Sequence, residues 1–349
     1  IVIWHTEEIL LALGQDPANA AGAAGYAQAM LWGFLPAAGF MLLRFFVAAL
    51  GRPNAALVVM VLAVMLNAVL AWALIFGRLG LPALGVVGAG LATSVANGFS
   101  FAALLGFVLL DRRLRRFYIL GRLWRADWHR LRELFRVGLP IGCILLLEVG
   151  LFSAAVQLMG LLGTAEIAAH QIALQCAAIA FMVPLGIGQA ATVRVGLAAG
   201  ARDAAAVKRA GWVALGLGVA FMSTTALLMW IVPQSLAGLF LDLERPENAP
   251  VVTLAVAFLN LAALFQVFDG VQTIALGALR GLKDTRVPAM LAAAGYWLVG
   301  FPTGALLAFR AGMGGVGVWW GLALGLAVVA VLALVRFTRR ERLGLLPRA

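Results

Sequence analysis

The stretch 251–279, VVTLAVAFLNLAALFQVFDGVQTIALGAL, decides the fold, because it is long and apolar and contains one charged residue, Asp269. A helix needs about 20 apolar residues to cross the core of a bilayer, so this stretch predicts a transmembrane helix. None of the apolar stretches alternates polar and apolar residues over about ten positions, as the strands of a membrane barrel do. The sequence therefore predicts an all-α polytopic membrane protein. Its other eight predicted spans are 28–50, 55–77, 84–110, 137–162, 167–199, 208–232, 287–309 and 314–336.

The composition of the 349 residues agrees with this prediction. Hydrophobic residues make up 64% of the chain and charged residues 12%, whereas a soluble domain is about half apolar and a quarter charged. These values exclude soluble enzymes, secreted disulfide scaffolds and disordered tails. The two cysteines, Cys143 and Cys176, stand in apolar stretches without metal-ligand spacing, so no metal site is predicted. The chain lacks a Walker A lysine motif, HExxH and GxSxG, and we therefore predict that it is not an enzyme.

The basic residues predict the orientation of the helices. The net charge is +11, and the segment 111–136 alone holds nine arginines. If that segment is cytoplasmic, the other basic loops and the C-terminus fall on the same side, as the positive-inside rule requires. The opposite loops carry the acidic residues Asp242, Glu244 and Glu247. A nucleic-acid surface would not predict such alternation from loop to loop, so we expect no nucleic-acid partner.

Similar patterns at a nearly constant offset indicate an internal repeat. The pattern formed by Gly85, Gly88 and Gly90 recurs about 227 positions later as Gly312, Gly315 and Gly317. The predicted organisation is a first-lobe remnant at 1–110, a basic cytoplasmic linker at 111–136 and a six-helix second lobe with a basic tail at 137–349. Since the second lobe has six helices and the first has three, we expect three further N-terminal helices, hence nine present of twelve. Parallel repeats of this kind enclose the binding site of many secondary transporters.

Two acidic residues, Glu148 and Asp269, are predicted to lie deep in the membrane. An acid at the bilayer centre costs about 2.5–3.5 kcal/mol, so such residues usually face a cavity and mark an ion pathway. The residues three or four positions from Asp269 share its helix face and suit a cation; they are Phe265, Gln266, Gln272 and Thr273. The apolar surroundings of Glu148 suit a proton relay. The alternative for both acids is a protonated group that hydrogen-bonds a neighbouring helix.

Other polar and helix-breaking residues supply further candidates. Asn67 is a candidate lining residue of a cavity, although amides between membrane helices often bridge neighbours instead. Pro184, Gly186 and Gly188 interrupt one predicted helix and could form a hinge or kink.

Several motifs resemble those of the MATE family of multidrug and toxic compound extrusion transporters. Their order and spacing match along essentially the whole chain. The motifs are GVVGAGLAT at 85–93, LEVGLF at 147–152, AAHQIA at 168–173, MVPLGIGQAA at 182–191, FQVFDG at 265–270 and LRGLKD at 279–284.

The resemblance implies a two-lobed bundle of twelve helices with a central cavity, in the bacterial inner membrane. It implies a monomeric antiporter without a cofactor, which exports cationic amphipathic compounds in exchange for H+ or Na+. It also implies that Glu148 and Asp269 are the second lobe's acids for the coupling ion. The alternatives left open are a lipid-linked precursor flippase of related fold, a channel, and an inactive truncated transporter.

Overall fold

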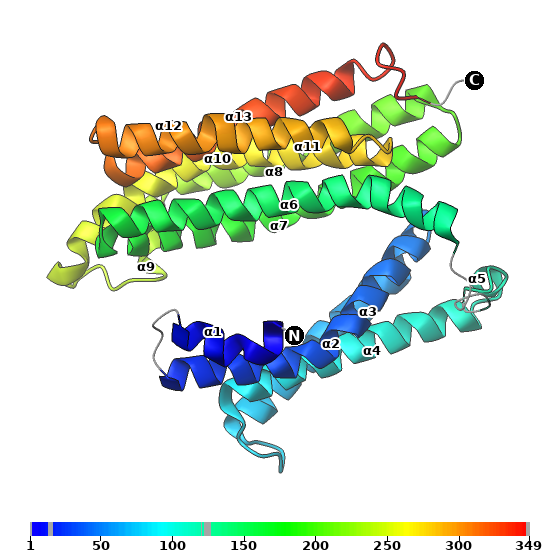
Figure 1. Cartoon of the computed structure of the whole chain (residues 1–349), viewed down its shortest axis with the longest axis horizontal. Coiled ribbons are helices and arrows are strands. Elements are labelled where there is room, and N and C mark those ends of the chain that lie inside the picture. Colours follow the sequence, from blue (N-terminus) through cyan, green and yellow to red (C-terminus); the bar gives the residue numbers. More distant parts are fainter. Residues whose placement is uncertain (1, 13–16, 120, 122–126, 347–349) are drawn as a thin grey trace. The chain divides into compact units, whose positions relative to one another are not determined.

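The structure is a computed structural model that describes residues 2–12, 17–119, 121 and 127–346. The described residues form helices joined by short loops, and they contain no strand (Figure 1). The first helices are η1 (Val2–His5), α1 (Thr6–Ala12), α2 (Pro17–Ala49), α3 (Pro53–Phe76), α4 (Gly85–Leu110) and α5 (Arg112–Arg115). They are followed by α6 (Trp128–Leu162), α7 (Thr164–Gly200), α8 (Ala204–Ile231), α9 (Pro233–Gly238), η2 (Pro246–Asn248) and α10 (Ala249–Gly281). The last are α11 (Arg286–Ala293), η3 (Ala294–Gly300), α12 (Phe301–Ala305), η4 (Leu306–Arg310) and α13 (Gly314–Thr338).

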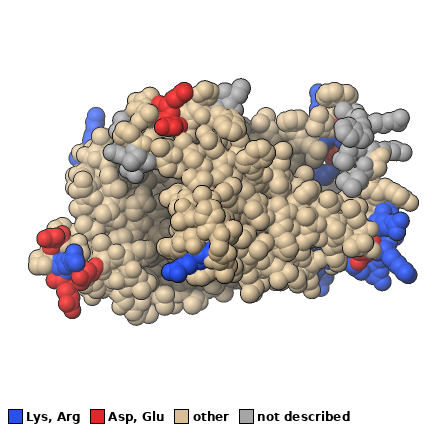
Figure 2. Space-filling model, turned by 90° about the horizontal axis from the view of Figure 1, so that it is seen from below, with Lys and Arg blue, Asp and Glu red and all other residues tan. Residues whose placement is uncertain are grey.

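Within the described part of the chain, nine helical segments are long and apolar enough to cross a membrane. They correspond one for one to the nine predicted spans, so the prediction of an all-α polytopic chain is confirmed. The eighth span, Arg286–Arg310, is made of α11, η3, α12 and η4, in which η3 and η4 are π-helical. On the face drawn in Figure 2, most of the surface is uncharged.

Two predicted helix starts were wrong. Helix α2 begins at Pro17 rather than at 28, and α6 begins at Trp128 rather than at 137. The first turns of α6 read WHRLREL, which is too polar for a membrane span, but Asp127 caps them by accepting a hydrogen bond from the backbone N–H of Arg130 at 3.1 Å. The end of the segment 111–136 is therefore helical, whereas its residues 120 and 122–126 lie outside the described residues.

The chain divides into two compact units, Ile1–Ala126 and Asp127–Ala349. In the first unit, α4 packs against α2 and α3, and in the second, α13 packs against α10 and against the segments from α11 to η4. The two units therefore share this arrangement of helices. The last two glycines of each repeated pattern lie at close contacts: a Cβ at Gly90 would lie 2.8 Å from the carbonyl oxygen of Tyr26, and one at Gly317 would lie 2.5 Å from the backbone nitrogen of Ala308.

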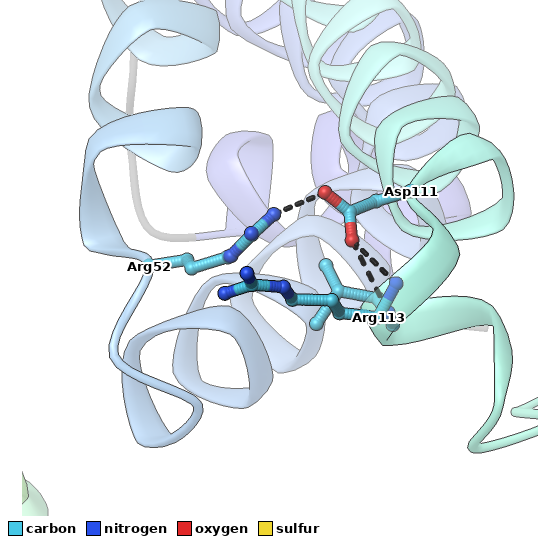
Figure 3. Close-up of polar contacts among 4 residues, drawn as sticks. Arg52, Asp111 and Arg113 are labelled. Carbon is cyan, nitrogen blue, oxygen red and sulfur yellow. Dashed lines mark hydrogen bonds and ion pairs between the residues drawn. The ribbon is translucent and has the colours of Figure 1, made fainter.

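Each unit also has an ion pair at corresponding helix ends. In the first unit, Arg52, before α3, donates to the carboxylate of Asp111, which caps α5 (Figure 3). In the second unit, Arg336 near the end of α13 donates to both oxygens of Asp284, at 2.6 Å and 3.1 Å. The cation and the anion have exchanged places between the two units.

The pair in the first unit predicts a pH-dependent stability. Desolvation acts to raise the pKa of Asp111, but the backbone N–H groups of Arg113 and Leu114 and the guanidinium of Arg52 outweigh it and lower the pKa below its ordinary value. A carboxyl with a lowered pKa stabilises the folded protein above its unfolded-state pKa, and this contribution is lost as the pH falls through the folded-state value. We expect Arg52→Gln to lower the melting temperature at neutral pH, and by less in acid. Thermal unfolding across that range measures the difference, with Arg113→Gln as the control because its backbone N–H remains.

Candidate functional site

The candidate site is built around α10, a long helix of the second unit that carries buried residues from Ala255 to Leu279. Its neighbours include α7, α8 and α13, which surround it with apolar side chains and small residues. Asp269 lies near the middle of this helix and is 5% exposed. Its Oδ1 atom has no hydrogen-bond partner among the described residues. A buried polar atom without a partner carries a free-energy cost, and such atoms are often found at functional sites.

Glu148 lies on α6 and is half-buried. It is within electrostatic range of Asp269, of the Arg280 guanidinium near the end of α10, and of the Tyr296 hydroxyl. The structure therefore brings the two predicted acids together. It also adds a cation and a phenol that the sequence had not assigned to the site.

The sequence predicted that the polar residues near Asp269 share one face of the helix. In the structure their side chains point toward different neighbouring helices. The Gln266 amide donates to the hydroxyl of Thr225 at 3.0 Å and to the carbonyl oxygen of Met222 at 3.4 Å, both on α8. The Thr273 side chain packs against α7, since a Cβ built at Gly188 would lie 3.4 Å from the Cγ2 atom of Thr273. The side chains of Gln266 and Thr273 therefore contact different helices, and these two residues do not form one common surface with Asp269.

Gln272 stays with the acids. It is fully buried, and neither its amide nitrogen nor its amide oxygen has a hydrogen-bond partner in the described structure. It lies beside Tyr296, although no hydrogen bond of good geometry joins the two side chains. The polar group of the second unit is therefore Glu148, Asp269, Gln272 and Tyr296, which we call the acid cluster.

Aromatic rings close off one side of α10. Phe265, one turn before Asp269, makes edge contacts with Phe152 of α6 at 6.0 Å and with Trp319 of α13 at 5.6 Å between ring centroids. Trp319 in turn lies 5.4 Å from the ring of His170 and 6.3 Å from that of Phe258. Phe265 is 1% exposed, so it packs in the core of the unit rather than presenting an open face to a ligand.

Tyr296 is a site residue that sequence reasoning missed. It lies in the π-helical segment η3 and is fully buried, and its hydroxyl has no hydrogen-bond partner among the residues described. Short π-helical stretches inside membrane helices are frequent at functional sites. The signal in the sequence is a polar tyrosine within the apolar run from Ala292 to Leu298. It is not an acid, so it did not stand out as Glu148 and Asp269 did.

The remaining candidates lie elsewhere. Asn67 is on α3 of the first unit, where its amide donates to the hydroxyl of Thr93 at 3.4 Å. Helix α7 runs without a break through Pro184, Gly186 and Gly188. Gly188 lies at a close contact with α10, since a Cβ built at Gly188 would lie 3.1 Å from the carbonyl oxygen of Thr273.

The acid cluster has the chemistry of a site for a proton or a monovalent cation. Two neighbouring carboxylates repel each other in a buried setting, so binding one positive charge relieves the repulsion. Carboxylate, amide and phenol oxygens are ligands that hard cations prefer. No group of three or more histidine, cysteine, aspartate or glutamate side chains in the described residues could hold a metal ion. The cluster therefore suits the binding and release of a single positive charge.

Comparisons with known proteins identify relatives of the chain. A family model described as MatE matches residues 1–73 and 140–306. A protein of Mesorhizobium japonicum, "Probable multidrug resistance protein NorM", is 52% identical over 344 residues, which are 99% of this chain and 74% of that protein. A protein of Brucella suis with the same name is 49% identical over 339 residues, covering 97% of this chain and 72% of its own length.

Solved structures show the same fold. A "MOP superfamily transporter from Pyrococcus furiosus" superposes with a TM-score of 0.86 at 19% identity, over all of this chain and 75% of that one. A Vibrio cholerae MATE transporter, VcmN, superposes with a TM-score of 0.84 at 19% identity, over 98% of this chain and 74% of that one.

Proposed function

Because the chain belongs to the MATE family, whose transporters are not enzymes, we propose that it is a secondary antiporter that exports cationic amphipathic drugs in exchange for H+ or Na+. Relatives named as multidrug resistance proteins support the drug class. The proposal needs no cofactor, since an ion gradient supplies the energy. We propose that the protein works as a monomer in the bacterial inner membrane.

One observation carries the antiport proposal: Asp269 is buried with an unpartnered carboxylate oxygen, within electrostatic range of Glu148. A buried acid without a partner persists only where it is useful, because replacing it with an apolar residue would remove the cost of its burial. In our proposal, the coupling ion and the cationic substrate compete for the negative charge of the acid cluster. The cluster binds the ion or attracts the substrate, but not both at once.

This competition couples the two fluxes when access alternates between the sides of the membrane. We propose that the two lobes of a twelve-helix bundle rock against each other, and that Pro184 and Gly186 on α7 allow bending. Gly186 suits this role because no atom outside its own helix lies within 4 Å of a Cβ built there. The cytoplasmic side is proposed to be that of the basic loops and the C-terminus, following the distribution of arginines.

Reconstituted transport tests the proposal. The chain is placed in proteoliposomes loaded with ethidium, and release is followed under an imposed pH gradient and then under a Na+ gradient. We expect gradient-driven release with one of the two ions, because each pH unit across the membrane corresponds to about 1.4 kcal/mol, a tenfold accumulation per proton. Lack of response to both gradients would contradict the antiporter proposal, and lipid-linked precursors would then be tested as substrates.

A further inference from the structure

A groove lies between α7 and α8 close to the loop that joins them, and it is separate from the acid cluster. Its volume is about 720 Å³. Most of its wall consists of alanines and aliphatic side chains of the two helices, including Ile187 and Ala191 of α7 and Val213 and Leu217 of α8. Val213 and Leu217 are 56% and 59% exposed, so apolar surface is open along the groove.

Two arginines, Arg194 of α7 and Arg209 of α8, are the charged residues of the lining. Both are exposed, and the lining contains no acidic residue. Among the described residues, neither arginine forms an ion pair or a side-chain hydrogen bond. An unpaired pair of guanidinium groups at one groove favours a ligand with negative charge, and phosphate is the group that Arg binds with the best geometry.

The arginines lie near the ends of their helices, on the side of the loop that joins α7 and α8. Arg194 is six residues before the end of α7 at Gly200, and Arg209 is five residues after the start of α8 at Ala204. At 1.5 Å per residue, both lie about 8–9 Å from the helix ends. The two ends of the apolar wall, Ile187 and Leu217, lie about 10–12 Å further along the same helices by the same rise. The groove is charged near the helix ends and apolar further along the helices. This pattern matches the polar head and the acyl chain of a lipid.

We propose that this groove binds one anionic glycerophospholipid of the cytoplasmic leaflet, with its phosphate at Arg194 and Arg209 and an acyl chain along the apolar wall. The choice of leaflet rests on the orientation in the proposed function, which places the α7–α8 loop in the cytoplasm. Basic pockets between transmembrane helices on that side bind anionic headgroups, and each nearby Lys or Arg strengthens the attraction. A free phosphate would leave the apolar wall uncovered, whereas a lipid covers both parts.

Lipid binding is measured without transport, so its failure and that of the antiporter proposal are distinguishable. The full chain is purified in detergent, mixed with equal amounts of phosphatidylglycerol and phosphatidylcholine, and examined by native mass spectrometry. We expect preferential retention of phosphatidylglycerol. The R194Q/R209Q variant should lower that retention about 25-fold, from about fivefold for each cation near the headgroup. The R202Q/K208Q control removes two cations from the same end of the helices but not from the groove lining, and should retain the lipid.

A second variant separates the lipid from free phosphate. Ala190→Phe adds a ring at an exposed position of the groove lining and keeps both arginines. This variant should no longer retain phosphatidylglycerol. Excess inorganic phosphate should not displace the lipid from the unsubstituted chain. The proposal is overturned if both lipids are retained equally, if the control pair loses lipid as much as R194Q/R209Q, or if inorganic phosphate displaces the lipid while Ala190→Phe does not.

Discussion

Asp269→Asn should abolish gradient-driven release of ethidium from proteoliposomes that contain the chain. Asparagine has nearly the same size as aspartate but cannot carry a negative charge or exchange a proton. Under an imposed gradient of two pH units, the proposed antiporter can support about a hundredfold substrate gradient for each proton exchanged. The variant should reach the level of protein-free liposomes, and its residual rate should not change with pH.

Stability distinguishes loss of coupling from loss of folding. Because Asp269 is buried with an oxygen that lacks a partner, the substitution replaces a buried ionisable group with a neutral amide of the same size and should leave the melting temperature nearly unchanged. The matched control is Asp242→Asn, at an exposed acid that pairs with Arg245 at 3.2 Å. A surface pair of that kind contributes about 0–1 kcal/mol, so the control should transport normally. Intact pH-dependent release by Asp269→Asn would contradict the proposed role of this acid.

The transmembrane helices were predictable because their signal is local. A span needs a long apolar stretch, and each of the nine stretches forms a helix in the described part of the chain. The start of α6 was missed for the same reason. Its first turns carry His129, Arg130 and Arg132, which hydropathy assigns to a loop, whereas the helix begins directly after its Asp127 cap.

The acid cluster was predictable only in part, because a sequence shows which residues are unusual but not which helix faces them. Glu148 and Asp269 stood out as acids within apolar stretches. Periodicity placed Gln266 on the same face as Asp269, but it bonds Thr225 of α8, which no local pattern indicates. Tyr296 joins the cluster through the packing of the eighth span on α6 and α13, and that packing depends on contacts between distant parts of the chain.

Gly277→Ala should lower the melting temperature of the protein by several degrees. The contact of α10 with α7 is so close that a Cβ at Gly277 would lie 2.4 Å from the carbonyl oxygen of Gly188 and 3.1 Å from its Cα. Those atoms belong to backbone, so a side-chain rotation cannot relieve the clash and the helices must move apart. The hydrogen bond that the Thr192 hydroxyl donates to the carbonyl oxygen of Gly277, at 2.8 Å, would be weakened as well.

Two opposing effects decide the magnitude of that change. Alanine favours a helix over glycine by about 1 kcal/mol, whereas overpacking costs about 1–3 kcal/mol and the weakened hydrogen bond about 1 kcal/mol more. The net destabilisation of about 1–3 kcal/mol corresponds to a fall of about 3–9 °C in a domain of this size. Gly216→Ala on α8 is the matched control, because no atom outside the helix lies within 4 Å of its Cβ, and it should be neutral or stabilising. If thermal unfolding in detergent shows the same shift for both variants, the helix contact at Gly277 is not what holds α7 against α10.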